Sequence, residues 1–136
     1  MSQTLTIQPA AAAGLDTKIA SDAAPTNYGT DTSVTVGEIN TGTAVGRTLI
    51  KFDLSGLPDN AVISSATLSL YCTADYSSNA RTFRVYRQKR AWTEAGATWN
   101  KYDGTNNWST AGGFHADDCE QTEIGSRAFT ATETLN

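Results

Sequence analysis

Two short runs with a two-residue period, joined by a turn, constrain the fold of this chain more than any other feature of its sequence. The first run covers residues 47–54 and the second covers residues 66–73. Successive side chains of a strand point to opposite faces, so this alternation predicts two strands that each bury one face. Residues 55–60, between them, contain glycine, proline, aspartate and asparagine, which favour turns. The predicted inner faces are Ile50, Phe52 and Leu54 in the first run and Ala66, Leu68, Leu70 and Cys72 in the second.

The same reasoning predicts an all-β protein. Apolar periodicity long enough for a helix is absent, and glycine, threonine, serine and asparagine are abundant. Residues 102–113 are rich in turn formers but contain aromatic side chains, which favours a long, well-packed loop over disorder. Further short strands are predicted at residues 4–7, 15–19 and 82–88 and at Val34 to Val36, with weak signals near Ile124 and at residues 128–130.

The length of 136 residues is sufficient for one domain with its own core. We expect residues 1–13 to form an N-terminal strand or arm and residues 14–136 to form one antiparallel β-sandwich. Strand signals are weak beyond residue 114. The sequence therefore predicts a sandwich that is incomplete at its C-terminal end, with an open edge to which a neighbouring chain could add a strand.

The order and spacing of several short motifs resemble a known family. The run from Arg47 to Pro58, followed by the run from Ile63 to Tyr71, is similar to the DNRLRE (disaggregatase-related) domain family. Upstream Asp16-Thr17 and downstream Trp92-Thr93-Glu94 extend the resemblance, which covers about residues 14–110. It implies a jelly-roll β-sandwich akin to carbohydrate-binding modules and a non-catalytic surface role. The residues that match the structural motif of the family are Asn27, Tyr28, Gly29, Arg47, Lys51, Phe52, Asp53 and Trp99.

Charge and hydropathy exclude several classes of partner. The net charge is −4, which disfavours nucleic-acid binding because phosphate neutralisation needs a basic surface. No apolar run approaches the roughly 20 residues that span a bilayer, so we expect no membrane partner. Residues 1–9 lack the charged and apolar regions of a signal peptide. A basic cluster at Arg81, Arg84, Arg87, Lys89 and Arg90 is interpreted as a solvated strand face or a set of ion pairs.

Candidate metal and catalytic groups form no recognisable site. Residues 115–120 hold the only histidine and one cysteine, which match no zinc spacing, so a solvated acidic loop is expected. Cys72 and Cys119 are expected as reduced thiols, with Cys72 buried. Neither a cofactor nor a metal is expected, and there is no G-x-S-x-G elbow. Loop aspartates that could bind structural calcium, without a recognised binding motif, are Asp16, Asp22, Asp31 and Asp103. The carboxylates that could form a catalytic pair for glycoside hydrolysis are Glu38, Asp53, Glu94 and Asp103.

Aromatic side chains supply the candidates for ligand binding. A platform that stacks on sugar rings could draw on Trp92, Trp99, Trp108, Tyr28, Tyr76 and Tyr102. We expect Trp99 in the core and Trp92 bracing a loop, whereas Trp108, between asparagine and serine residues, is expected to be exposed. The predicted ligand-binding residues are Trp108, Tyr102, Trp92 and Arg84.

Three functional hypotheses follow. The first is a non-catalytic structural or adhesion module of a larger assembly, such as a bacteriophage capsid decoration or tail-fibre component, with a homo-oligomer or virion proteins as partners. The alternative is a carbohydrate-binding module that recognises a polysaccharide, and the third is a polysaccharide-degrading enzyme. We expect no enzyme activity. The expected location is the virion for a phage protein and otherwise the cell surface or the extracellular space.

Overall fold

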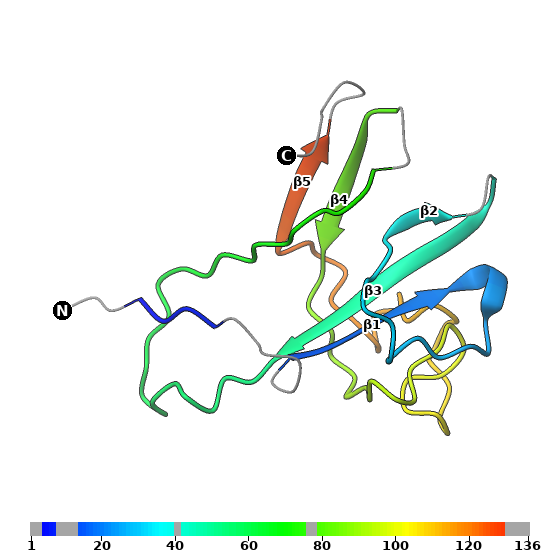
Figure 1. The fold of residues 1–136 in the computed structure, drawn as a ribbon. Coiled ribbons are helices and arrows are strands. Elements are labelled where there is room, and N and C mark those ends of the chain that lie inside the picture. The colour runs from blue at the N-terminus through cyan, green and yellow to red at the C-terminus, as the bar shows by residue number, and fades with distance from the viewer. Residues whose placement is uncertain (1–3, 8–13, 40–41, 76–78, 130–136) are drawn as a thin grey trace.

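The computed structural model describes residues 4–7, 14–39, 42–75 and 79–129, and its largest sheet has three antiparallel strands (Figure 1). The central strand, β3 (Ala44–Phe52), contains residues 47–52 of the first alternating run, which continues two residues beyond the strand. It pairs on one side with β1 (Gly14–Ala20) and on the other with β2 (Gly37–Ile39). A short 3-10 turn, η1 (Ser21–Ala23), follows β1.

A second, two-stranded sheet joins segments that are far apart in the sequence. It pairs β4 (Arg81–Val85) antiparallel with β5 (Gly125–Phe129). The rings of Phe83 and Phe129 meet edge to face with centroids 5.1 Å apart, a favourable arrangement for an aromatic pair. Ile124 N also donates a hydrogen bond of 2.9 Å to Val85 O, which continues the pairing beyond the strand end.

The core lies between the three-stranded sheet and the long connection from β4 to β5. Its buried cluster consists of Ile19 from β1 and of Trp92, Ala97 and Trp108 from the connection. In Figure 1 this connection, coloured yellow to orange, coils beside β1 and β3. Within the described part of the chain, the cluster includes no residue of β4 or β5. The side chains that pack against the cluster are Leu15, Leu49, Trp99 and Tyr102.

Several sequence predictions are confirmed. The chain is all-β with antiparallel sheets, in agreement with the β-sandwich class, while the jelly-roll connectivity stays a prediction. The strands predicted at residues 15–19, 47–54 and 82–88 correspond to β1, β3 and β4. The weak signal at residues 128–130 falls at the end of β5, with residue 130 outside the described residues. Among the described residues, no helix has the length and hydropathy needed to cross a bilayer.

The predicted strand at residues 66–73 is wrong. Residues 61–75 lie outside both sheets and are exposed throughout, so Cys72 is an exposed thiol instead of a core residue. Alternation indicates which side chains a strand would bury. The segment becomes a strand only when a partner strand pairs with its backbone and a second layer covers its apolar face. Val34 and Val36 are likewise exposed and precede β2, and residues 4–7 belong to no strand.

The predicted inner face of β3 is also partly wrong. Leu54 is 52% exposed, and Ile50 and Phe52 are only half-buried. Leu49, on the opposite face, packs against the core cluster instead. The reason is that the connection from β4 to β5, which carries the tryptophans, covers this face of the sheet. The alternation within β3 cannot predict which of its two faces is covered.

Candidate functional site

A tight loop between Thr98 and Trp108 forms the wall of the candidate site. Trp108 is 4% exposed, and its indole Nε1 donates a hydrogen bond of 2.9 Å to Thr98 O. Lys101 N donates to Thr98 Oγ1 at 3.0 Å, while Thr98 N donates to Lys101 O at 2.8 Å. Lys101 and Asn107 then form a β-bridge. The buried indole therefore fixes the loop from below, and the polar residues of the loop are held above it.

An aspartate closes the tip of this loop. Asp103 Oδ1 accepts hydrogen bonds from Thr105 N at 2.9 Å and Asn106 N at 2.6 Å, and Asp103 Oδ2 accepts one from Asn106 Nδ2 at 2.7 Å. These bonds from Asn106 and Thr105 hold the pKa of Asp103 below its ordinary value. Gly96 lies against the tip, because a Cβ there would be 2.4 Å from the carbonyl carbon of Asp103.

The segment after η1 is clamped by an asparagine to residues 94–97, which lead into the loop. Asn27 Nδ2 donates hydrogen bonds of 2.7 Å to both Glu94 O and Ala97 O, and its Oδ1 accepts one from Gly29 N at 3.1 Å. Gly29 must be a glycine, since a Cβ would lie 2.4 Å from Glu94 O. Asp16 N completes the contact by donating to Glu94 Oε1 at 3.0 Å. The clamp fixes β1 and residues 25–29 against the loop.

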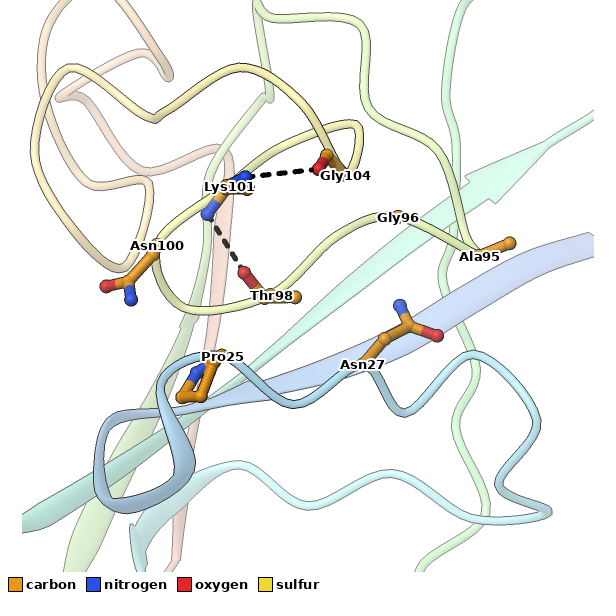
Figure 2. A pocket seen from close by; sticks show the side chains of 8 residues that line it. All are labelled: Pro25, Asn27, Ala95, Gly96, Thr98, Asn100, Lys101 and Gly104. Carbon is orange, nitrogen blue, oxygen red and sulfur yellow. Dashed lines mark hydrogen bonds between the residues drawn. The ribbon is translucent and has the colours of Figure 1, made fainter.

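Two hollows of about 310 Å³ each lie on either side of the turn at Asn100 and Lys101. Figure 2 shows Pro25 and Asn27 along one side of the first hollow and residues 98–101 along the other. On the loop side of this hollow, Lys101 Nζ donates a hydrogen bond of 3.3 Å to Gly104 O. The first hollow is lined by Pro25, Asn27, Ala95, Gly96, Thr98, Asn100, Lys101 and Gly104, and the second by Asn100, Lys101, Asn107, Trp108 and Ala111.

A comparison with protein families shows which family this chain belongs to. The model of carbohydrate-binding module family 96 matches residues 7–115, which is most of the chain. The chain belongs to this family. The matched region includes β1 to β4 and every residue that lines the two hollows. No curated protein and no solved structure matches the chain significantly.

Membership of family 96 supports the second functional hypothesis, a carbohydrate-binding module, more than the first. The resemblance predicted from the sequence was correct at this coarser level, while the match itself names family 96 and not the DNRLRE family. Nothing in the match supports a bacteriophage virion role. Families of carbohydrate-binding modules are typically non-catalytic, in agreement with the expected lack of enzyme activity.

The predicted exposure of Trp108 is wrong, because the side chain is buried. Trp108 lies at the floor of the second hollow. The polar neighbours of Trp108 face solvent while the ring turns inward to the core. Trp92 is 7% exposed and also belongs to the core. Tyr102 is half-buried, with its ring centroid 5.6 Å from that of Trp108 and 5.0 Å from the Arg90 guanidinium carbon.

Arg84 lies on β4, outside both hollows, and is ion-paired with Glu123 at 2.9 Å. The structure therefore does not bring the four predicted ligand-binding residues together on one surface, and their role in binding stays a prediction. The interpretation of the basic cluster as ion pairs agrees with this contact and with those of Arg81 to Asp75, Arg87 to Glu120 and Arg90 to Asp118. Tyr76 lies outside the described residues.

The motif residues predicted by the resemblance have structural contacts. Arg47 NH1 donates a hydrogen bond of 2.6 Å to Gly112 O, and its guanidinium carbon lies 4.9 Å from the Trp99 ring centroid. Trp99 packs against the core cluster as expected. The remaining motif residues contribute less to the core. The Tyr28 ring centroid lies 4.4 Å from Lys18 Nζ, and Asp53 Oδ1 accepts a hydrogen bond of 2.9 Å from Ser55 N. Phe52 is half-buried and Lys51 is exposed.

A buried aspartate was missed by the sequence analysis, which interpreted residues 115–120 as a solvated loop. Asp118 is 0% exposed and accepts hydrogen bonds from Arg90 Nε at 2.7 Å and Ser109 N at 2.9 Å. Burial raises the pKa of Asp118, but the bonds from Arg90, Thr110 and Ser109 outweigh it and leave the pKa lowered. No local pattern marks this residue, because its partners are distant in the sequence.

The described residues contain no group of three or more histidine, cysteine, aspartate and glutamate side chains that could hold a metal ion. Both cysteines are free, in agreement with the predicted thiols. The carboxylates of Asp53, Glu94 and Asp103 each accept hydrogen bonds from backbone N–H groups. Asp53 and Asp103 therefore brace local turns, and Glu94 joins its loop to β1.

Proposed function

We propose that the chain is a non-catalytic module that binds a polysaccharide through the two hollows beside Asn100 and Lys101. The observation that carries this proposal is that both hollows lie within the part of the chain that matches a family of carbohydrate-binding modules. All lining residues fall within the family 96 match. Asn100 and Asn107 are exposed, and within the described structure their side-chain amides make no hydrogen bond to the protein.

The chemistry of the lining suits a sugar. An amide offers two N–H donors and a carbonyl acceptor, which match the hydroxyl groups of a pyranose ring. Lys101 adds a cation at the shared wall, and Pro25 and the edge of Trp108 add apolar surface. Because both hollows are open and adjoin one turn, the surface suits a sugar chain better than a single enclosed ligand.

Affinity electrophoresis against a panel of neutral and acidic polysaccharides tests the proposal. We expect at least one polysaccharide to retard the native chain. The variants Asn100→Ala and Asn107→Ala should each weaken the retardation by about tenfold, the equivalent of one or two hydrogen bonds. Asn60→Ala, at an exposed asparagine in a turn outside the hollows, serves as the matched control and should bind as the native chain does.

Intrinsic fluorescence provides a second measurement. Trp108 lines the second hollow, so polysaccharide should change the tryptophan emission of the native chain, and the Asn107→Ala variant should need about tenfold more polysaccharide to reach half of the same change. Equal binding by the native chain and both asparagine variants would refute the assignment of the site. An absence of binding across neutral and acidic polysaccharides would refute the function.

A separate observation favours a second role, in a larger assembly. Residues 61–75 expose an apolar, extended segment that contributes nothing to either hollow. An exposed segment of this kind is typical of an interaction surface. We propose that this segment supports a structural or adhesion role alongside polysaccharide binding, and the measurement of self-association described below tests it.

A further inference from the structure

Residues 61–74 form an extended segment whose backbone lies outside both sheets (Figure 1). Exposure reaches 93% for Val62, 67% for Leu70 and 84% for Tyr71. Within the described structure, the segment makes one backbone hydrogen bond to other backbone, from Ala61 N to Pro58 O. Unpaired N–H and C=O groups beside exposed apolar side chains are a template for the addition of a strand.

The charge of this segment favours a second copy of the chain as the added strand. No charged residue lies between positions 60 and 74, although the chain as a whole carries a net charge of −4. Asp75, the next residue, is ion-paired with Arg81. Two copies can therefore bring their segments together without placing like charges opposite each other. A strongly charged partner, in contrast, would find no opposite charge along the segment.

An antiparallel pair centred on Ser69 keeps the apolar face and the hydroxyl-bearing face of the segment separate. In a pair centred on Ser69, each Leu68 lies opposite Leu70 of the other copy, and each Ala66 lies opposite Cys72. Residues directly opposite each other point to the same face, so the apolar side chains gather on one side. On the other side, each Thr67 lies opposite Tyr71, a favourable β-branched and aromatic pair. A shift by one residue would place each leucine opposite a serine, threonine or tyrosine and mix the faces.

We propose that residues 64–74 of two copies pair as antiparallel strands around a two-fold axis at Ser69, which makes the protein a homodimer. The pairing satisfies the open backbone groups and covers part of the exposed apolar side chains. It also explains why the strand pattern at residues 66–73 is strong although no other described segment of the chain pairs with it. The interface shares no residue with the two hollows, so it stands or fails independently of polysaccharide binding.

Disulfide cross-linking tests the register. The substitution Ala66→Cys places a new thiol opposite the native Cys72 of the other copy, and the symmetry creates two such pairs. Opposed positions on paired strands lie close enough for a disulfide. Under mild oxidation we expect Ala66→Cys to form covalent dimers about tenfold faster than Thr67→Cys, whose thiol points to the opposite face. Adding Cys72→Ser to Ala66→Cys should abolish this difference.

Sedimentation of the native chain tests the association itself. We expect a concentration-dependent dimer of the 14.4 kDa chain. Leu70→Lys puts a charge opposite each Leu68 and should weaken dimerisation by about tenfold or more. Val62→Lys adds the same charge outside the paired stretch and should leave it nearly unchanged. Circular dichroism of each variant confirms folding.

Two results would overturn the proposal. Equal cross-linking rates for Ala66→Cys and Thr67→Cys would reject the register. A monomer at every concentration would reject the second copy as the occupant and would leave the segment to another part of this chain or to a different protein. Loss of dimerisation in Leu70→Lys with retained polysaccharide retardation would separate the interface from the sugar site.

Discussion

Replacing Asp118 with alanine measures how much the loop over the core depends on one buried carboxylate. The side chain accepts hydrogen bonds from Arg90 Nε at 2.7 Å, from Ser109 N at 2.9 Å and from Ser109 Oγ at 3.2 Å. Its removal leaves a guanidinium and a backbone N–H without their acceptor. Losing one partner of a buried ion pair costs about 3–5 kcal/mol. Because the Arg90 side chain keeps 31% exposure to water, we expect the lower value, about 3 kcal/mol.

Thermal and urea unfolding provide the assay. A loss of about 3 kcal/mol in a chain of this length corresponds to a fall in Tm of roughly 10 °C. The control is Asp117→Ala, since the Asp117 side chain is 70% exposed and its removal should change the free energy of unfolding by less than about 0.5 kcal/mol. A loss below about 1 kcal/mol for Asp118→Ala would refute the idea that this network holds the loop.

The pH dependence of the same variant gives an independent check. The folded pKa of Asp118 is lowered, so its carboxylate contributes stability that is fully present above the unfolded pKa of about 3.9. That contribution is lost as the pH falls through the folded pKa. The free energy of unfolding of the native chain should therefore decline below about pH 4, and the part of the decline that comes from this residue should be missing in Asp118→Ala. An identical decline in both proteins would contradict the assignment.

Three further predictions concern the packing around the site. Gly112→Ala should cost about 2 kcal/mol or more in unfolding experiments, because φ is +87° and a Cβ would lie 2.5 Å from Arg47 NH1; Gly56→Ala, which meets no atom within 4 Å, should be nearly neutral. Asn27→Ala should cost about 2 kcal/mol by removing two donors of 2.7 Å, and faster hydrogen exchange at residues 94–97 would report the freed loop. A thiol reagent should modify Cys72 quickly and Cys119 slowly, since burial raises the pKa of Cys119 and leaves it 2% exposed; equal rates would contradict this assignment.

Local sequence patterns were sufficient to predict strands and turns that depend on neighbouring residues. The alternation at residues 15–19 and 82–88 predicted β1 and β4, because each strand has one face against other protein. The motif at Asn27 and Gly29 predicted its family correctly at the level of a carbohydrate-binding module, and its residues form the clamp on the loop. The aromatic side chains among the turn formers of residues 102–113 also predicted the well-packed loop that holds Trp108.

The candidate site was predicted less well, because exposure depends on residues that are distant in the sequence. The polar neighbours of Trp108 suggested an exposed ring, yet the ring fills the core and Nε1 is satisfied by Thr98 O. The polar groups of the proposed site, Asn100 and Asn107, have no local signal, since asparagine in a loop is common. Only the approach of residues 25–27 to residues 95–104 creates the first hollow.

The sequence by itself determined the class of the fold, the similarity to carbohydrate-binding modules and the positions of most strands, since these follow from side-chain alternation and motif order over short distances. The tertiary structure alone decided which faces are covered. Leu49 is covered because the tryptophan-bearing connection packs on its side of β3, and Asp118 is buried because Arg90 and Ser109 meet it there. Residues 66–73 have the pattern of a strand but no partner within the described chain, because pairing requires a second strand that local sequence cannot supply.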